Sequence, residues 1–469
     1  MNQIIITALE NIVGTSQTFT DARVLETFSK DQYAFSPVLI ELLNEKRAEV
    51  MVAPDSSQQL AAIVNLAALE SMPLTIRGAG SGNYGQAVPL HGGILVSLHR
   101  FNKIISIDPV TQTARVQAGV RLGNLEREAR THGLELRFYP STWATATVGG
   151  FIGGGFGGVG SIQYGTLWDE FVLEAEILPM TEQPKLERLT GWDCLPVIHA
   201  YGTTAIMTEL TVKLAPATNW EESVFSFPSL EDALGFAQEI ALDDTLKKRE
   251  VGIFEAPMAS YFKPLEAAGG VKEGRTVVLL ELEDGKTTTL ETRASKLGGT
   301  LDYFNPHATY HHSSFALSDF TWNHTTLWAI KADPSWTYTQ ARFELDKLLE
   351  QVRAIKTKFG GEVLMHLEFI RERISEGGVL VAASLPLIKF SNKARLFEIQ
   401  DFFESIGVQV ADPHTYYLDD DSRWSGETVL NGVARFNPKG LLNPGKLRVL
   451  ETGEASKAAN SWFGSSNKT

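Results

Sequence analysis

Two short glycine-rich stretches constrain the fold of this chain more than any other feature. The first, Arg77–Gly85, reads Arg-Gly-Ala-Gly-Ser-Gly-Asn-Tyr-Gly, and the second concentrates its glycines within Gly149–Gly160. Glycine tolerates positive φ and lets the backbone approach an anion closely, so successive N–H groups can point into one concavity. The first stretch follows an expected strand, Leu74–Arg77. It therefore predicts a backbone cradle for a phosphate group, although a glycine-rich turn between two strands would fit the same residues.

Two common nucleotide-binding motifs are excluded by their surroundings. The first stretch is not a P-loop, because no Lys-Ser or Lys-Thr follows its last glycine. In the second stretch, Gly155-x-Gly157-x-x-Gly160 satisfies the dinucleotide fingerprint. However, no β-branched strand precedes it, and the residues Ser161–Asp169 that follow show no helical stripe. We therefore reject a Rossmann domain.

Composition excludes several further classes of protein. The chain has 469 residues, which favours two or three domains. Its net charge of −14 disfavours a nucleic-acid partner, since binding a phosphate backbone needs a basic surface. The single cysteine, Cys194, excludes an intrachain disulfide and a four-cysteine zinc site. No apolar run reaches the ~18–20 residues of a transmembrane helix, and the first residues do not resemble a signal peptide, so we expect a cytoplasmic protein.

The order of strands and helices indicates an α+β fold in two parts. Before a break at Pro216–Glu221, short expected strands flank helices over Gln58–Ser71 and from Leu122 to a C-terminal Gly133. After it, expected strands alternate with expected helices, which predicts a sheet covered on one face by helices. The strands are Arg275–Glu283, Val363–Ile370, Val379–Leu387 and Val408–Asp412, and the helices are Ala233–Ile240, Leu290–Leu297, Gln340–Phe359 and Asn392–Ile406.

Five motifs, taken in order, resemble the FAD-binding flavoproteins of the vanillyl-alcohol oxidase and p-cresol methylhydroxylase (PCMH) family. They are the Arg77–Gly85 stretch, Thr147-Val-Gly-Gly150, Tyr164-Gly165, Gly202-Thr-Thr-Ala-Ile-Met-Thr-Glu209 and Asn443-Pro-Gly-Lys446. The resemblance covers about residues 40–217 and the C-terminal piece. It implies a PCMH-type FAD-binding domain of two subdomains over residues 1–217, completed by the returning segment 413–450. It also implies an α+β cap domain, an antiparallel sheet covered by helices, over residues 218–412. We expect residues 451–469 to be disordered.

The resemblance also implies which residues hold FAD. The first stretch would bind the pyrophosphate through its backbone, and the later motifs would line the rest of the cofactor channel. The candidate cofactor-binding residues are Arg77, Gly78, Ala79, Gly80, Ser81, Gly82, Asn83, Ser141, Thr147, Gly149, Gly150, Gly154, Tyr164 and Ile206. Members that tether FAD covalently often carry histidine just after the glycines, where this chain has Ser81. We therefore expect non-covalent FAD.

The implied activity is the FAD-dependent oxidation of a CH–OH group. The chain resembles the glycolate and D-lactate dehydrogenase branch of the family, which implies a small 2-hydroxy acid as substrate. In the implied reaction a hydride passes to flavin N5 while a base takes the hydroxyl proton. That branch also carries His-x-Gly-Asp-Gly-Asn-x-His and Gly-Glu-His-Gly segments, and neither is present here. The alternatives are a sugar, alcohol or lactone oxidase or dehydrogenase, a subunit of a larger dehydrogenase with iron–sulfur partners, or a non-catalytic flavin-fold module. The electron acceptor (oxygen, a quinone or a protein) stays open, as does the formation of a homodimer.

Three residues are candidates for catalysis. On a strand, His366 would share one face with Glu368, and a carboxylate beside a histidine orients it as a base. In this fold the late segment often returns over the flavin, which makes His414 the favoured base and Tyr416 a candidate to polarise the substrate oxygen. The alternative for each is a structural role, as a hydrogen-bonded histidine or a packed aromatic ring.

The candidates for substrate binding come from the expected cap. The segment Trp322–Lys331 resembles the one from which related dehydrogenases present a cation to a substrate carboxylate, so His324 and Lys331 are candidates, and Arg371 is a third. Ordinary surface charge is the alternative for each of them. His311 and His312 do not predict a metal site, because adjacent residues on a strand point to opposite faces.

Overall fold

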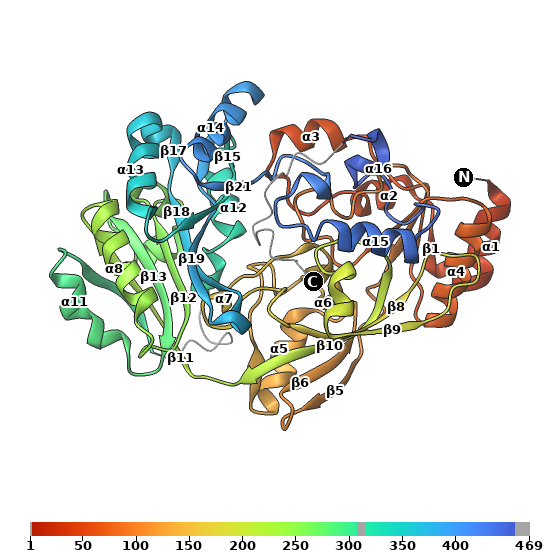
Figure 1. The fold of residues 1–469 in the computed structure, drawn as a ribbon, viewed down its shortest axis with the longest axis horizontal. Helices are drawn as coiled ribbons and strands as arrows, with labels where there is room; N and C mark the ends of the chain where they lie inside the picture. The colour runs from red at the N-terminus through yellow and green to blue at the C-terminus, as the bar shows by residue number, and fades with distance from the viewer. Residues whose placement is uncertain (1, 307–314, 455–469) are drawn as a thin grey trace.

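The computed structural model describes residues 2–306 and 315–454. An eight-stranded sheet with its helices forms one end of the molecule, and the N-terminal sheets form the other (Figure 1). The last helices, α15 (Glu427–Phe436) and α16 (Arg448–Thr452), return to the N-terminal half. His311 and His312 lie outside the described residues, as do residues 455–469 of the expected tail.

The N-terminal half begins with a four-stranded sheet in the order β1-β2-β4-β3. Strands β2, β3 and β4 pair in parallel, and β2 and β4 are buried along their whole length, as is typical of parallel sheets covered by helices. The strands are β1 (Thr18–Phe19), β2 (Val50–Val52), β3 (Leu74–Arg77) and β4 (Ile94–Ser97), and the helices are α1 (Gln3–Val13), α2 (Ala22–Phe28), α3 (Pro37–Leu43) and α4 (Ser57–Leu69).

A second, antiparallel sheet follows, with β10 pairing with β6, β7 and β8. Burial alternates along β6 and much of β10, so one face of these strands packs inside and the other is more exposed. The strands are β5 (Ile104–Asp108), β6 (Thr113–Gln117), β7 (Leu134–Leu136), β8 (Val172–Leu178), β9 (Glu187–Thr190) and β10 (Ile206–Pro216), and the helices are α5 (Leu122–Thr131), α6 (Val148–Gly154) and α7 (Ser161–Tyr164).

The third sheet is antiparallel and runs β14-β11-β13-β12-β18-β19-β16-β21. Its strands are β11 (Trp220–Phe227), β12 (Lys248–Phe254), β13 (Thr276–Glu283), β14 (Thr300–Asn305), β16 (Gln340–Glu344), β18 (His366–Glu372), β19 (Val379–Ser384) and β21 (Gln409–Ala411). A small sheet beside it joins β15 (Trp336–Tyr338), β20 (Leu387–Lys389) and β17 (Val363–Leu364). The accompanying helices are α8 (Leu230–Leu242), α9 (Ala256–Ala259), α10 (Lys263–Ala267), α11 (Glu291–Ser295), α12 (Asn323–Ala332), α13 (Leu348–Phe359) and α14 (Lys393–Ser405).

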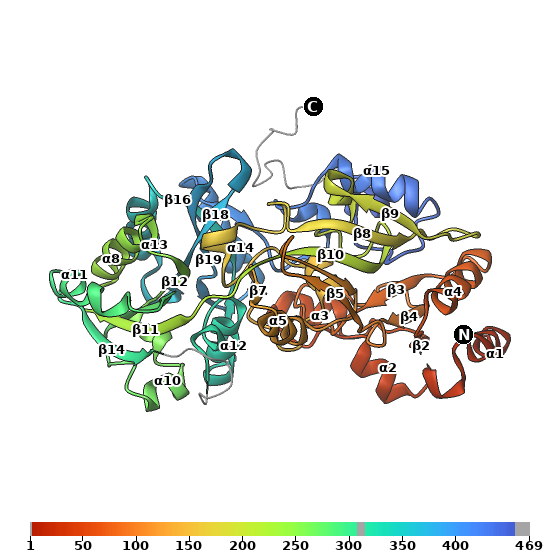
Figure 2. The same cartoon turned by 90° about the horizontal axis from the view of Figure 1, so that it is seen from below.

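The two faces of the third sheet have different neighbours. Leu367 and Phe369 of β18 belong to a core shared with α8, α13 and α14, which cover that face. His366 and Glu368 occupy the alternate positions of β18, and Glu368 accepts from the Trp322 N–H just before α12, so they belong to the opposite face. Figures 1 and 2 show α12 between this sheet and the N-terminal half. The α+β fold and the antiparallel sheet covered by helices are as predicted, and this second face supplies one wall of the site.

One predicted helix was wrong over its first eight residues. Gln340–Glu344 forms strand β16 and not the start of a helix, which begins only at Leu348. The strand pairs with β19 on one side and β21 on the other. These long-range partners override the local preference of the residues for helix.

Among the described residues, no helix is both long and apolar enough to cross a lipid bilayer. The same part of the chain contains no cluster of metal-ligating side chains. Cys194 is buried as a free thiol. The domain boundaries at 217 and 412 stay predictions.

Candidate functional site

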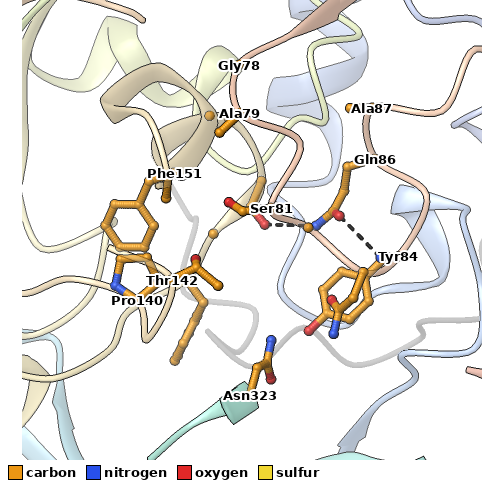
Figure 3. A pocket seen from close by; sticks show the side chains of 18 of the residues that line it. Gly78, Ala79, Ser81, Tyr84, Gln86, Ala87, Pro140, Thr142, Phe151 and Asn323 are labelled. Carbon is orange, nitrogen blue, oxygen red and sulfur yellow. Dashed lines mark hydrogen bonds between the residues drawn. The ribbon is translucent and has the colours of Figure 1, made fainter. Parts of the chain in front are cut away.

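A cavity connects the glycine-rich stretches with the third sheet. One wall is the loop after β3, a second comes from α6 and the start of β10, and a third comes from the start of α12 with β16 and β19. In Figure 3, Ala79 and Ser81 of the loop lie across from Phe151 of α6, and Asn323 approaches from α12. Segments far apart in the sequence thus share one chamber.

The loop presents its backbone to this cavity. Among the described residues, none of the backbone N–H groups of Gly78–Asn83 donates to an acceptor. Gly80 has φ +72°, and a Cβ there would lie 1.9 Å from an Arg77 guanidinium nitrogen. A Cβ at Gly78 would lie 2.3 Å from Thr147 Oγ1, the atom that caps α6 by accepting from the Gly150 N–H. The loop therefore offers a row of unused N–H donors, and close contacts with Arg77 and Thr147 hold its backbone in place. Such a backbone is suited to bind an anion.

Charged groups beneath the loop favour the same ligand. Arg77 is buried, and its Nε and Nη1 form no hydrogen bond with the described residues. The Asp31 carboxylate accepts from the Gly85 N–H at 2.6 Å, and the buried Lys446 donates to the Gly85 carbonyl. Burial raises the pKa of Asp31, against the pull of Arg77, and lowers the pKa of Lys446. The ionised Arg77 guanidinium beneath the open N–H groups therefore favours an anionic ligand such as a pyrophosphate.

The predicted cofactor residues gather in this cavity with two exceptions. All of them except Arg77 and Tyr164 line its wall. Arg77 lies under the loop, against Gly80. Tyr164 lies on α7, which contacts β12 and β18, and its ring faces the Arg137 guanidinium at 5.6 Å. Tyr164 is therefore not among the residues that line the wall.

Of the three predicted substrate-binding residues, His324 lies on the cavity wall. Burial, with a contribution from Lys331, lowers the pKa of His324 to about 4, so its ring is neutral at neutral pH. Lys331 lies in the last turn of α12, with Nζ 5.0 Å above the Trp328 ring. Arg371 is paired with Asp244 at 2.5 Å. Lys331 and Arg371 are not among the residues that line the cavity.

The three predicted catalytic residues also lie off the cavity wall. His366 is fully buried, stacks on Phe254, and places Nε2 2.7 Å from Glu368 Oε1. His414 is held between Ser36 Oγ and the Tyr338 carbonyl, each at 2.7 Å. Tyr416 packs beside Tyr417 and under Lys446. These hydrogen bonds and ring contacts hold the three side chains in place, and their catalytic roles stay predictions.

The wall contains polar residues that sequence reasoning missed. They are Asp31, Tyr33, Tyr84, Gln86, Thr142, Tyr201, Asn323, Gln340, Ser384 and Arg423. Asn323 and Gln340 come from the cap side of the cavity, and Tyr84 Oη accepts from Gln340 Nε2 across it. Arg423 lies just after a run of three aspartates, Asp419–Asp421. An arginine close to an acidic run is usual on a protein surface, so the sequence offered no sign that this segment is buried at a cavity.

Two buried glutamates fix the start of α12. Trp322 has φ +52°, rare for a large side chain, and its N–H donates to Glu368 Oε1 at 2.7 Å while its indole N–H donates to Glu250 Oε2 at 3.1 Å. Glu250 lies opposite Glu281, which lies opposite Glu222, so carboxyl groups form a row across three neighbouring strands. Burial raises the pKa of Glu250 and of Glu368. Glu250 and Glu368 hold Trp322, and with it the adjacent wall residues Asn323 and His324, at the cavity.

A pH-dependent contribution to stability follows from Glu368. A carboxyl whose pKa is raised by folding stabilises the protein at low pH, and this stability is lost as the pH rises through the raised pKa. Compared with Glu368→Gln, which keeps an acceptor for Trp322, the wild-type protein should therefore lose on the order of 1–3 kcal/mol between about pH 5 and about pH 8. Denaturant unfolding at both pH values measures this, with the exposed Glu376→Gln as control. Parallel pH curves for the wild type and Glu368→Gln would contradict it.

Comparisons with known proteins agree with this geometry. The family model described as FAD binding domain matches residues 48–181. D-lactate dehydrogenase of Anaerostipes hadrus is 33% identical over 231 residues, 47% of this chain and 46% of that protein. The glycolate oxidase subunit GlcD of Escherichia coli is 29% identical over 238 residues, 49% of this chain and 46% of that protein. A solved alkyldihydroxyacetonephosphate synthase has a TM-score of 0.72 at 16% identity, over 95% of this chain and 85% of that one.

The 4-ethylphenol oxidase of Gulosibacter chungangensis has a TM-score of 0.63 at 14% identity, over 95% of this chain and 96% of that one. At such identities the solved structures establish the fold alone. The comparisons confirm the predicted resemblance to PCMH-type flavoproteins, and residues 48–181 are an FAD-binding domain with FAD as its cofactor. The chain spans about half the length of the curated relatives it matches.

Proposed function

We propose that this chain is an FAD-dependent oxidoreductase that oxidises the CH–OH group of a small 2-hydroxy acid. One observation carries the proposal: the anion-binding loop and the neutral His324 lie on the wall of the same cavity. The substrate class is supported by the names of the relatives, which include D-lactate dehydrogenases and glycolate oxidase subunits. A further relative, from Stutzerimonas stutzeri, is named D-2-hydroxyglutarate dehydrogenase.

Residues on and beneath the cavity wall would bind the cofactor and take the substrate proton. The loop residues Gly78–Asn83 would hold the pyrophosphate, with Arg77 beneath them. Bound FAD supplies the two-electron acceptor for the hydrogen that leaves the substrate carbon. His324 replaces His414 as the proposed base, because its neutral ring can accept the hydroxyl proton and it lies on the wall. Trp322, held by Glu368 and Glu250, keeps the His324 segment in position.

Non-covalent binding of FAD is part of the proposal, since Ser81 occupies the position where covalent members often have histidine. The purified protein should be yellow, and acid precipitation should release the colour to the supernatant. A yellow pellet would contradict non-covalent binding. If the protein stayed colourless after incubation with FAD, this result would contradict the proposal that it is an FAD-dependent enzyme.

The substrate class is tested by anaerobic bleaching of the flavin absorbance with glycolate, D-lactate, simple alcohols and sugars. The 2-hydroxy acids should bleach it fastest. Bleaching by an alcohol or a sugar alone would move the assignment to that substrate class. We also propose a cytoplasmic location, which the single, buried and unpaired Cys194 favours.

A further inference from the structure

Arg423 is an arginine on the cavity wall. It lies between the short 3-10 helix Leu418–Asp420 and α15, and its guanidinium stands 5.6 Å above the ring of Phe156, another wall residue. In the described part of the chain, the charged or titratable wall residues other than tyrosines are Asp31, His324 and Arg423. An arginine stays ionised at every physiological pH, so Arg423 is the permanent cation of this wall.

The buried Asp421 holds Arg423, and His199 contacts Asp421 in turn. Arg423 Nε donates to Asp421 Oδ1 at 2.8 Å and Nη2 to Asp421 Oδ2 at 2.5 Å, which is a bidentate pair. His199 Nε2 lies 3.2 Å from the same oxygen, Asp421 Oδ2. All three side chains are at least nine-tenths buried. The guanidinium is therefore fixed in one orientation before any ligand arrives.

The backbone beneath these partners is equally constrained. His199 and Tyr201 have φ values of +48° and +49°, which are rare outside glycine. Their N–H groups donate to the carbonyls of Ile152 and Gly153 in α6, each at 2.8 Å. The segment is thus tied to the helix that forms the second wall of the cavity. Such strained, over-determined positions are typical of functional sites.

A second hydrogen bond of His199 fixes the orientation of its ring. His199 Nδ1 lies 2.6 Å from the Gly155 carbonyl oxygen, which can only accept, so Nδ1 donates this bond. The other ring nitrogen, Nε2, then faces Asp421. Against the effect of burial, Arg423 and the hydrogen bond from His199 hold the pKa of the Asp421 carboxyl well below its usual range, so Asp421 is an ionised partner for the guanidinium. The cluster therefore holds Arg423 in place from the Gly155 backbone onward.

We propose that Arg423, oriented by Asp421 and His199, binds the carboxylate of the substrate and selects 2-hydroxy acids over neutral alcohols and amides. The inference rests on the proposed function, because it names the residue that recognises this substrate class. A guanidinium held in one orientation matches a carboxylate in shape and charge. It also replaces Lys331 and Arg371, which do not line the cavity.

The turnover experiment uses the holoenzyme and an isosteric pair of substrates, D-lactate and its amide. In Arg423→Met, the KM for D-lactate should rise roughly 10- to 100-fold, the loss expected for one charge-assisted interaction, while the KM for the amide changes little. The matched control is Arg353→Met, which removes another bidentate arginine–carboxylate pair, with Glu231, on the exposed surface. Equal changes for acid and amide would overturn the proposal, since they would mark Arg423 as merely structural.

A second measurement keeps the proposal falsifiable where Arg423→Met does not fold or D-lactate is not oxidised. Arg423→Lys keeps the charge but loses the planar fork. Oxalate, a dicarboxylate probe, is titrated into the oxidised holoprotein and followed by the flavin absorbance. The wild type should bind oxalate at least about tenfold more tightly than Arg423→Lys. If the wild type binds oxalate more tightly than Arg423→Lys but does not oxidise D-lactate, the result would contradict the proposed function and still support Arg423 as a carboxylate site. Equal oxalate affinities, or no binding to the wild type, would overturn the Arg423 inference.

Discussion

Replacing Gly78 with alanine should yield a folded protein that no longer retains FAD. The new Cβ would lie 2.3 Å from Thr147 Oγ1, so the loop and the cap of α6 must move apart. The backbone of Gly78 is not in the left-handed region, so the change disturbs this contact and not the chain direction. We expect at least about a 100-fold loss of FAD affinity, or roughly 2.7 kcal/mol, measured by reconstitution of the apoprotein followed by flavin fluorescence.

The matched control is another glycine-to-alanine change in open space. Gly361, just after α13, has no positive φ, and a Cβ added there would meet no neighbouring atom within 4 Å, so Gly361→Ala should retain FAD like the wild type. Circular dichroism of both apoproteins checks that they are folded. If Gly78→Ala bound FAD with unchanged affinity, the loop would not be the pyrophosphate site.

The cofactor side could be predicted from the sequence because its geometry is local. Glycines are required where the loop turns through positive φ, as at Gly80 and Gly85, and where Gly78 meets Thr147. Each requirement selects a residue type at a fixed spacing, so the motif is visible in the chain itself. Tyr164 shows the limit of this reasoning. The motif contains a tyrosine there, but α7 packs on β12 and β18, the Tyr164 ring faces Arg137, and it does not line the cavity.

The substrate side could not be predicted because it depends on contacts between distant segments. Gln340 reaches the wall through pairing of β16 with β19 and β21, and Arg423 is held there by Asp421, which His199 also contacts. His324, His366 and His414 are chemically alike in the sequence. They differ in their surroundings, which only tertiary packing determines. His366 is hydrogen-bonded to Glu368, and His414 is hydrogen-bonded to Ser36. Residue type predicts the chemistry a side chain can perform, and the sheet register decides where it is performed.

Replacing His324 with glutamine should lower kcat by about 10²- to 10⁴-fold, the usual contribution of a positioned general base. Glutamine keeps the approximate size and polarity of the ring but cannot take the hydroxyl proton. FAD content should be unchanged, because His324 approaches the cavity from α12 and not from the glycine-rich loop. Stopped-flow reduction by D-lactate at saturating substrate measures the effect separately from substrate binding.

The pH profile and three histidine variants together assign the base. The pKa of His324 is lowered to about 4, so its neutral, active form dominates above that value. For the wild type, kcat/KM should stay flat through neutral pH and fall only below about pH 5, and His324→Gln should lack this acidic limb. The exposed His132→Gln is the matched control and should behave as the wild type. His414→Gln should lower the Tm, since it disturbs the bonds to Ser36 and Tyr338. A loss of kcat in His414→Gln with full activity in His324→Gln would return the base to His414, because the proton acceptor must be the group whose removal stops the chemistry and not the fold.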